Sequence, residues 1–223
     1  MLTAARDIAG LVNVFFRLKI AIKIDRAESP TGYSDLQALY LAARDGWGEG
    51  AVVEIGSFKG KSSIALAFGS MDKGREEVYC VDPHVEGTKE AFFRNIRDAR
   101  ADSQIVPVIA PSEEAVRGFD RPIRFIFIDG NHEYEFVRKD IALWKDKVID
   151  GGVLAFHDYT FPGVRKAIGE MTGGGGYTVE TATGCTLYVS KGNRRNARLF
   201  ETIDRFNRIK NCLFFGKRPI AKW

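Results

Sequence analysis

The sequence predicts an α/β protein with a Rossmann-like, doubly wound and mostly parallel sheet, arranged as a three-layer α/β/α sandwich. Short apolar runs alternate regularly with helical stretches between residues 51 and 156, a pattern typical of βαβ units whose sheet is covered on both faces. The first of these runs ends in a glycine-rich turn, as expected where such a sheet binds a ligand. At 223 residues and 45% hydrophobic content, the chain is long enough for one full-sized domain with appendages.

Helices are expected before this alternation begins. Residues 1–24 carry apolar side chains near helical spacing, which predicts an amphipathic helix that stops at the turn residues 29–32. A second helix is predicted from Asp35 to Arg44, followed by a glycine-rich loop. We therefore expect three segments, namely an N-terminal helical segment over 1–48, a ligand-binding domain over 49–190 and a basic amphipathic tail over 191–223.

The alternating part of the chain predicts each strand and helix in turn. The expected strands of the parallel sheet are Ala51 to Ile55, Glu77 to Val81, Gln104 to Ile109, Ile123 to Ile128 and Gly152 to Phe156. The helices are expected at Lys61 to Phe68, Thr88 to Arg100, a short stretch from Ser112, Glu133 to Val148 and Gly163 to Met171. Two adjacent strand-like runs, Tyr177 to Thr181 and Cys185 to Val189, predict a terminal hairpin.

The basic charge of the chain lies entirely in its tail. Residues 191–223 hold ten Lys or Arg and two acidic residues, a net charge of +8, so the total of +4 leaves −4 for residues 1–190. The tail predicts a helix from Arg194 to Lys210 with an apolar stripe. Such a stripe favours packing on the N-terminal helix or on a second subunit, as in a homodimer, whereas its cations are also typical of segments that bind membrane surfaces or nucleic acid.

The location of the protein is predicted from its cysteines and its hydrophobic runs. Cys80, Cys185 and Cys212 are odd in number and far apart, which favours a reducing compartment over a disulfide framework. No run approaches the roughly 18 consecutive apolar residues of a membrane-spanning helix. We expect a cytoplasmic protein, with a peripheral membrane contact through the tail left open.

The glycine-rich turn between the first strand and the first helix, residues 54–62, predicts a nucleotide-like ligand. Glycines let the backbone approach a ligand closely, and the amino terminus of a helix offers unpaired N–H groups. A P-loop needs four residues between its first glycine and Gly-Lys-Ser, and only three stand between Gly56 and Gly60. The Gly-x-Gly-x-x-Gly fingerprint of dinucleotide sites is also missing, although a nicotinamide-dependent oxidoreductase on a similar sheet stays an alternative. A glycine-rich first turn without a ligand, which any α/β protein can have, is the structural alternative.

An acidic residue, Asp82, ends the second expected strand. A carboxylate at this point of a nucleotide-binding sheet can accept hydrogen bonds from both hydroxyls of a ribose. Because Pro83 follows it, Asp82 is also suited to a purely structural turn.

Together these residues resemble class I methyltransferases that depend on S-adenosylmethionine (SAM), most closely the bacterial subfamily of macrocin-type and sugar O-methyltransferases. The resemblance rests on the Glu-x-Gly-x-x-x-Gly turn at Glu54, on Asp82, and on two stretches, residues 125–132 and 151–158. It covers about residues 30 to 190. It implies a seven-stranded sheet whose last strand is antiparallel, and a SAM-binding methyltransferase domain over 49–190.

The resemblance also implies roles for individual residues. Glu54, Gly56 and Ser57 would line the methionine and ribose portion of SAM, Asp82 would hold the ribose, and Ser112 would lie beside the adenine. The residues expected to bind the cofactor are Glu54, Gly56, Ser57, Gly60, Ser62, Asp82, Pro83, His84, Ser112 and Asp129. In the divalent-metal O-methyltransferases, the positions of Asp129, His157 and Asp158 ligate Mg²⁺. The resemblance leads us to expect three oxygen ligands at these positions. His157 departs from this set, because imidazole suits softer metals such as Zn²⁺ or Fe²⁺.

The reacting site is expected at the tips of the fourth and fifth strands. A cation at Asp129 and Asp158 would lower the pKa of an acceptor hydroxyl. Without a metal, His132 is placed to act as the general base, since its intrinsic pKa of about 6.5 suits proton transfer at neutral pH. As alternatives, His132 would cap the helix after it, and residues 157 and 158 would form a polar turn.

Two missing motifs exclude some classes of methyl acceptor. The Asn/Asp-Pro-Pro-Tyr/Phe motif of enzymes that methylate amino groups does not follow the fourth strand, and the Pro-Cys nucleophile of cytosine C5 enzymes is absent. We therefore expect O-methylation of a small-molecule or glycan hydroxyl. A non-catalytic protein with the same fold, which binds RNA or a membrane through its tail, is the other alternative.

Overall fold

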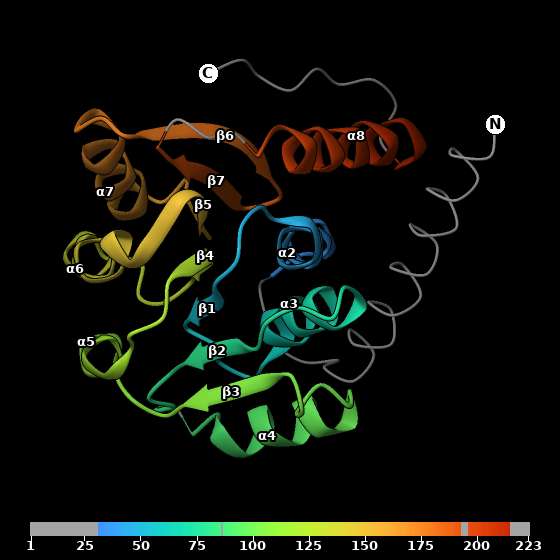
Figure 1. The fold of residues 1–223 in the computed structure, drawn as a ribbon, viewed down its shortest axis with the longest axis vertical. Coiled ribbons are helices and arrows are strands. Elements are labelled where there is room, and N and C mark those ends of the chain that lie inside the picture. The colour runs from blue at the N-terminus through green and yellow to red at the C-terminus, as the bar shows by residue number, and fades with distance from the viewer. Residues whose placement is uncertain (1–30, 86, 193–195, 215–223) are drawn as a thin grey trace.

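The computed structural model describes residues 31–85, 87–192 and 196–214, and the helix expected over 1–24 lies outside them. Seven strands form one sheet in the order β3-β2-β1-β4-β5-β7-β6 (Figure 1). Their bounds are β1 Ala51–Ile55, β2 Val78–Val81, β3 Ile105–Val108, β4 Ile123–Ile128, β5 Val148–Phe156, β6 Tyr177–Thr183 and β7 Thr186–Lys191. β1 to β5 are parallel, and β7 runs antiparallel to both of its neighbours. The predicted sheet, with its antiparallel last strand, is confirmed.

Helices cover both faces of the sheet, which confirms the three predicted layers (Figure 1). One face carries α2 (Tyr33–Asp45), α3 (Lys61–Asp72), α4 (Lys89–Asp98) and α8 (Ala197–Phe214). The other face carries α5 (Ser112–Ala115), α6 (Tyr134–Trp144) and α7 (Pro162–Gly173), with short 3₁₀ turns at Val116–Gly118 and Lys145–Lys147. Each face has its own apolar core, so β1 and β4 are buried along their whole length. Continuous burial explains why these strands are almost wholly apolar, with Glu54 and Arg124 as their two charged residues.

The fifth strand begins earlier than the sequence predicts. We expected a helix up to Val148, but α6 ends at Trp144, and β5 already starts at Val148 after a 3₁₀ turn. Val148 is buried and pairs with Ile123, and the register then shifts before the strand continues. Gly151 allows this irregularity because its φ of 79° lies in the left-handed region.

Helices at both ends of the described chain belong to the same core as the sheet. α2 is buried on nearly all sides, and Leu199, Phe200 and Ile203 of α8 share its core. The Asn196 side chain accepts a hydrogen bond from the Trp47 amide (2.9 Å) and donates one to the Gly151 carbonyl (2.7 Å). The start of the basic tail therefore packs on α2 and the sheet. The expected packing on the helix over 1–24 lies outside the described residues. None of the described helices is long and apolar enough to cross a membrane.

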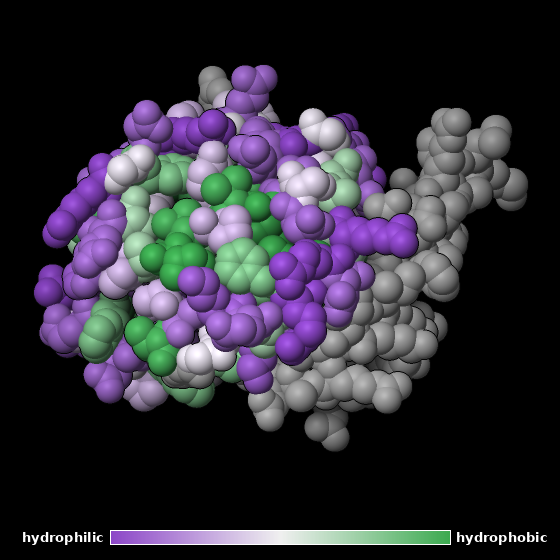
Figure 2. Space-filling model, turned by 90° about the horizontal axis from the view of Figure 1, so that it is seen from below, coloured by the Kyte–Doolittle hydropathy of each residue, from purple (hydrophilic) through white to green (hydrophobic). Residues whose placement is uncertain are grey.

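The edge of the sheet at β3 is partly uncovered. Val106 and Val108 of this strand are partly exposed, and Ile109 just beyond it is 40% exposed. Viewed from the side on which α4 and β3 lie, apolar side chains gather in the middle of the surface, with hydrophilic ones around them (Figure 2). Pro107 removes one N–H from this edge, which limits pairing with another strand.

A buried arginine fastens α2 to the end of the sheet away from the strand tips. Arg124 of β4 is 1% exposed, and its guanidinium donates hydrogen bonds to the carbonyls of Ala42 (3.3 Å) and Ala43 (2.6 Å) at the end of α2. It also pairs with Glu76 at 2.9 Å, and the other oxygen of Glu76 accepts a hydrogen bond from the Gly50 amide. Partial burial raises the pKa of Glu76, but its own amide, Arg124 and Gly50 lower it to about 2.

This pairing predicts a stability that depends on pH. Because the pKa of Glu76 is lowered from 4.5 to about 2, its contribution is present above pH 4.5 and is lost as the pH falls through 2. We expect Glu76→Gln to lower the free energy of unfolding by about 1–2 kcal/mol at neutral pH, with the deficit shrinking below pH 4.5. Urea unfolding at several pH values measures this. Glu77→Gln, which removes an exposed pair with Arg121, is the control, and a deficit that stays constant with pH would contradict the assignment.

Candidate active site at the strand tips

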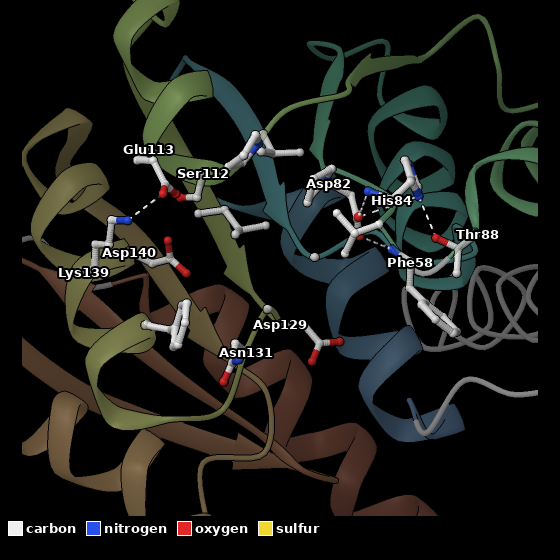
Figure 3. A pocket seen from close by; sticks show the side chains of 18 residues that line it. Phe58, Asp82, His84, Thr88, Ser112, Glu113, Asp129, Asn131, Lys139 and Asp140 are labelled. Carbon is white, nitrogen blue, oxygen red and sulfur yellow. Dashed lines mark hydrogen bonds and ion pairs between the residues drawn. The ribbon is translucent and has the colours of Figure 1, made fainter.

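A cavity of about 490 Å³ opens beyond the carboxyl ends of β1, β2 and β4 (Figure 3). It lies where the strand order reverses between β1 and β4, the point at which open α/β sheets bind ligands. Six of the residues predicted to bind the cofactor line it, namely Gly56, Asp82, Pro83, His84, Ser112 and Asp129. The sequence thus predicted residues from four different strand tips that share one cavity.

Gly56 brings two of these strand tips together. Its φ is 88°, and a Cβ atom built on it would lie 2.2 Å from the carbonyl oxygen of Asp129. Only glycine allows the backbones of β1 and β4 to approach so closely at this conformation. At Gly56 the turn after β1 therefore presents only backbone to the cavity.

Asp82 holds the two loops at the cavity wall. Its carboxylate accepts hydrogen bonds from the amides of Phe58 (2.7 Å) and His84 (2.6 Å) (Figure 3). Both of these residues have positive φ, 47° and 53°, so the carboxylate stabilises two strained turns. The structural turn left open for Asp82 is therefore present. It does not exclude a ligand, because each carboxylate oxygen can accept a second hydrogen bond.

Four residues predicted at the cofactor lie behind the cavity wall instead. Glu54, Ser57, Gly60 and Ser62 are not among the lining residues. Glu54 is fully buried and accepts a hydrogen bond from the Ser63 hydroxyl. Burial raises the pKa of Glu54 to about 7, and hydrogen bonds from Ser62, Ser63 and Cys80 offset only part of this rise. Among the described residues, Ser57 Oγ has no hydrogen-bond partner.

The cavity also contains residues that the sequence did not single out. They include Phe58, Thr88, Asn131, Phe136, Lys139 and Asp140. Thr88 Oγ1 lies 2.8 Å from Nδ1 of His84 and fixes that imidazole, whose pKa burial lowers. Asp140 is 8% exposed although it is acidic. One sequence signal could have identified Asp140 as buried. It lies on the apolar stripe of α6, four residues before the buried Trp144.

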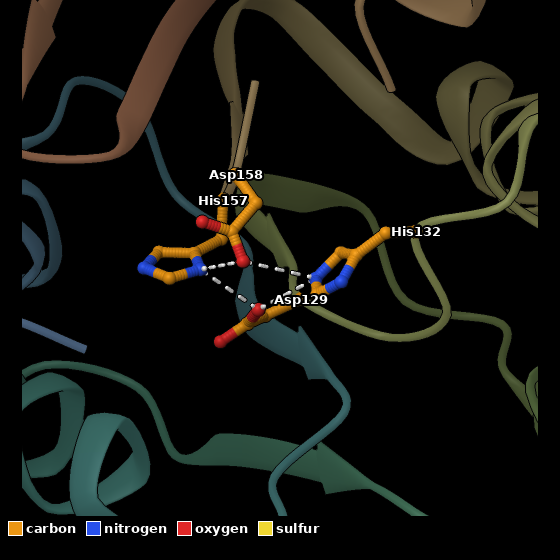
Figure 4. A group of neighbouring side chains, drawn as sticks. All are labelled: Asp129, His132, His157 and Asp158. Carbon is orange, nitrogen blue, oxygen red and sulfur yellow. Dashed lines mark ion pairs between the residues drawn. The ribbon is translucent and has the colours of Figure 1, made fainter. Parts of the chain in front are cut away.

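Four polar side chains from the tips of β4 and β5 cluster beside the cavity (Figure 4). Nδ1 of His157 lies 3.1 Å from Asp129 and 3.3 Å from Asp158. Nε2 of His132 lies 3.6 Å from Asp129 and 3.4 Å from Asp158. Asp129 is therefore common to the cavity and the cluster.

The two imidazoles of the cluster differ in their surroundings. His157 is 2% exposed, whereas the side chain of His132 is 34% exposed. Burial lowers the pKa of His157, but Asp129, Asp158 and Asp35 raise it to about 9. The neighbouring Asp129 raises the pKa of His132 more than burial lowers it, with Asp158 adding to the rise. The carboxylates therefore favour the charged form of both rings.

His132 does not cap α6, which was its alternative role. The amide of Glu133 is bound instead by the Asn131 side chain, at 2.8 Å. The His132 ring packs edge-on against Phe161, with centroids 5.2 Å apart. A Cβ atom on Gly163 would lie 2.6 Å from the His132 carbonyl, so the start of α7 supports this loop at close range.

The cluster has the chemistry of a divalent-metal site. One ligand atom from each of the four residues lies within 4.8 Å of the others. Two imidazoles and two carboxylates suit Zn²⁺, Fe²⁺ or Mn²⁺ better than Mg²⁺, which prefers oxygen ligands. Asp158 has a positive φ of 47° and its carbonyl accepts a hydrogen bond from the Phe161 amide (2.8 Å). The polar turn left open for residues 157 and 158 thus exists and presents both side chains to the cluster.

Comparisons with known proteins agree with this architecture. Residues 53–159 match a family model described as a methyltransferase domain. The O-methyltransferase TomG from Streptomyces achromogenes, involved in tomaymycin synthesis and solved with SAM, is 17% identical with a TM-score of 0.62, over 79% of this chain and 90% of TomG. An O-methyltransferase from Bacillus cereus in complex with SAH is 17% identical with a TM-score of 0.59, over 78% and 90%. The O-methyltransferase NovP is 14% identical with a TM-score of 0.64, over 82% and 99%. At these identities the likeness shows the fold alone.

Proposed function

We propose that this chain, a class I SAM-dependent methyltransferase, moves the methyl group of SAM to a hydroxyl oxygen of a small-molecule or glycan acceptor. One observation carries the proposal. Asp129 belongs both to the cavity at the strand tips and to the cluster of two histidines and two aspartates. A cofactor in the cavity and an acceptor at the cluster would therefore meet at a single residue.

The cavity has the features that a nucleoside with an amino-acid tail needs. SAM supplies an electrophilic methyl group on a sulfonium. Asp82 would accept hydrogen bonds from the ribose hydroxyls, and the exposed backbone at Gly56 would let the cofactor approach the sheet. Ser57 Oγ, in the same turn, is a buried polar atom without a partner among the described residues, and such atoms are rare unless a ligand or water satisfies them.

The cluster would activate the acceptor. His132 is the more exposed imidazole of the cluster, and its ring would take the proton from the acceptor hydroxyl as the oxygen attacks. Its Nε2 is buried and faces the two carboxylates. Asp129 and Asp158, both within 3.6 Å of that nitrogen, would orient the ring and stabilise it once protonated. If a divalent cation is required, Asp129, His157 and Asp158 would hold it, and it would supply a lower pKa at the acceptor hydroxyl.

The rim of the site suits a ring-bearing acceptor. Phe161, which packs on His132, is 47% exposed, and Phe136 at the cavity is 50% exposed. Exposed aromatic faces next to polar groups favour ligands with an apolar face and few polar contacts, such as aromatic rings or sugars. The O-methyltransferases of the same fold support a hydroxyl as the acceptor.

The ribose assignment predicts a loss of cofactor affinity. We expect Asp82→Ala to weaken the binding of S-adenosylhomocysteine by about 1.5–3 kcal/mol, the range for hydrogen bonds to a charged group. Isothermal titration calorimetry measures this, with the exposed Asp102→Ala as the control. Unchanged affinity in Asp82→Ala would refute the assignment, and stabilisation of the wild type by NAD but not by SAH would refute the proposed cofactor.

The donor set predicts a metal preference. Because two of the four donors are imidazoles, we expect the EDTA-stripped protein to bind Zn²⁺ or Mn²⁺ more tightly than Mg²⁺. Titration of each ion into the wild type and into Asp158→Asn tests this, and the variant should lose most of the affinity. A preference for Mg²⁺, or equal binding in both proteins, would speak against a metal at these residues.

The base assignment predicts a loss of turnover. We expect His132→Gln to lower the rate of methyl transfer about 10²- to 10⁴-fold, the usual contribution of general acid–base catalysis, while SAH binds with wild-type affinity. The assay follows SAH release with a panel of phenols, catechols and sugar nucleotides. Glu135→Gln on the exposed face of α6 is the control. A rate within a few-fold of the wild type would remove His132 from the mechanism.

A further inference from the structure

The turn between β6 and β7 lies beside the cluster of two histidines and two aspartates. β5 and β7 pair in antiparallel fashion as far as Phe156 and Leu187. Carried two residues further, the same register places Cys185 opposite Asp158. The Cys185 carbonyl also accepts a hydrogen bond from the Tyr159 amide (3.4 Å). Cys185 therefore stands at the edge of the sheet that carries the cluster.

The backbone of Cys185 is held in place, whereas its side chain is exposed. Its amide donates a hydrogen bond to the buried carboxylate of Asp35 in α2 (2.9 Å). Gly184 has a φ of 57°, and a Cβ atom built on it would lie 2.1 Å from Oδ2 of Asp35, so only glycine fits there. Cys185 itself is exposed. The turn is thus fastened to α2 in one position, and the thiol is left uncovered by the core.

The Cys185 thiol lies close to the carboxylates of the cluster. Partial burial raises its pKa, and the charges of Asp35, Asp158 and Asp129 raise it further. The thiol is therefore protonated at neutral pH and behaves as a small, weakly polar group that contacts apolar surfaces and aromatic rings. An exposed side chain this close to both carboxylates borders the open side of the cluster.

Phe161 borders the other end of the cluster. Its exposed ring packs edge-on against His132, with centroids 5.2 Å apart. Its amide donates a hydrogen bond to the Asp158 carbonyl (2.8 Å). Both exposed side chains are thus tied to Asp158, Phe161 through this bond and Cys185 through the strand register. They flank the cluster, at the His132 end and at the Asp35 end.

The cluster between these two side chains has capacity to bind a ligand. His157 is 2% exposed, and neither of its ring nitrogens has a hydrogen-bond partner of good geometry in the described part of the chain. Nδ1 of that ring points into the cluster, toward Asp129 and Asp158 (Figure 4). Buried polar atoms of this kind are usually satisfied by a ligand or by water. We therefore expect the polar group of a ligand at the cluster and its apolar part between the flanking side chains.

We propose that Cys185 and Phe161 form the two walls of an acceptor subsite that holds a ring next to the cluster, and that the small thiol sets how wide a ring is admitted. The inference rests on the proposed function, since it presumes that the acceptor hydroxyl reaches the cluster. A phenyl face and a protonated thiol both favour contact with the apolar face of a ring. A larger side chain at position 185 closes the subsite, and loss of the phenyl group at position 161 removes one wall.

Disulfide exchange at Cys185 tests the subsite without knowledge of the acceptor. The probes are the mixed disulfides of N-mercaptoethyl benzamide and of N-mercaptoethyl acetamide with β-mercaptoethanol, so both probes share one linker. The Cys185 sulfur bonds to the amide-bearing sulfur of the probe, the disulfide of the probe breaks, and the thiol proton passes to the released β-mercaptoethanol. Excess β-mercaptoethanol keeps the exchange at equilibrium, and intact-protein mass spectrometry measures the labelled fraction. The parent protein carries Cys212→Ser, and Cys80 is buried.

The ratio of the two labelling equilibria is the result that decides. We expect the benzamide probe to label the parent protein about fivefold more strongly than the acetamide probe, because an aromatic contact adds to the shared linker. In Phe161→Ala the ratio should fall to near one. In Phe136→Ala, which changes the cofactor cavity instead, it should stay as in the parent. A ratio near one in the parent, or a ratio that survives in Phe161→Ala, would overturn the inference.

Turnover measures the effect of the subsite on specificity. Because Cys185→Trp fills the subsite, we expect it to lower the rate of methyl transfer to the ring-bearing acceptors of the panel by about tenfold or more, with SAH affinity unchanged. Val179→Trp, at an exposed position of the same hairpin, is the control and should keep the wild-type rate. A wild-type rate in Cys185→Trp would also count against the subsite. If the wild type neither binds SAH nor transfers a methyl group, the proposed function fails, and the labelling ratio still decides whether the subsite exists.

Discussion

The structure depends on one constraint, which is that the parallel strands are buried on both faces. β1 and β4 are fully buried from end to end, and apart from the hydrogen-bonded Glu54 and Arg124 their side chains are apolar. The polar side chains of the site therefore follow the strand tips. Since neighbouring parallel strands end at the same edge, Asp82, Asp129, His157 and Asp158 are brought together from segments far apart in the sequence. The buried Arg124 fastens α2 at the other end of the sheet, away from this edge.

Backbone strain is concentrated at the same edge. Of the four described non-glycine residues with positive φ, three follow strand tips at the site, namely Phe58, His84 and Asp158. Such conformations cost free energy and persist where hydrogen bonds hold them, as Asp82 holds the first two. These strained conformations lower the stability of the fold and hold the side chains of the site in place. Strained residues commonly cluster where ligands bind.

The sequence predicted most of the fold because its signals are local. Alternating apolar runs, glycines and polar residues at strand tips, together with the family resemblance, pointed to six of the cavity residues and to all four residues of the cluster. The sequence was less informative where contacts between distant segments determine the position of a residue. Glu54 was expected at the cofactor, which stays a prediction, but the sequence did not show that its carboxylate is buried and accepts a hydrogen bond from Ser63. Asp140 was missed because its cavity is closed by segments on other strands, and the start of β5 was missed because pairing with β4 overrides the helical pattern before it.

The cluster shows how a distant helix completes a site that the strand tips begin. Asp35, in the first turn of α2, is 2% exposed, and its carboxylate binds the Cys185 amide (2.9 Å) and the Thr186 hydroxyl (2.8 Å). These bonds dock the turn between β6 and β7 onto α2. Asp35 is also one of the charges that raise the pKa of His157. Asp35, Asp129 and Asp158 thus all favour the charged form of a ring that is almost fully buried. α2, which lies outside the residues matched by the methyltransferase family model, is thus part of the electrostatic environment of the site.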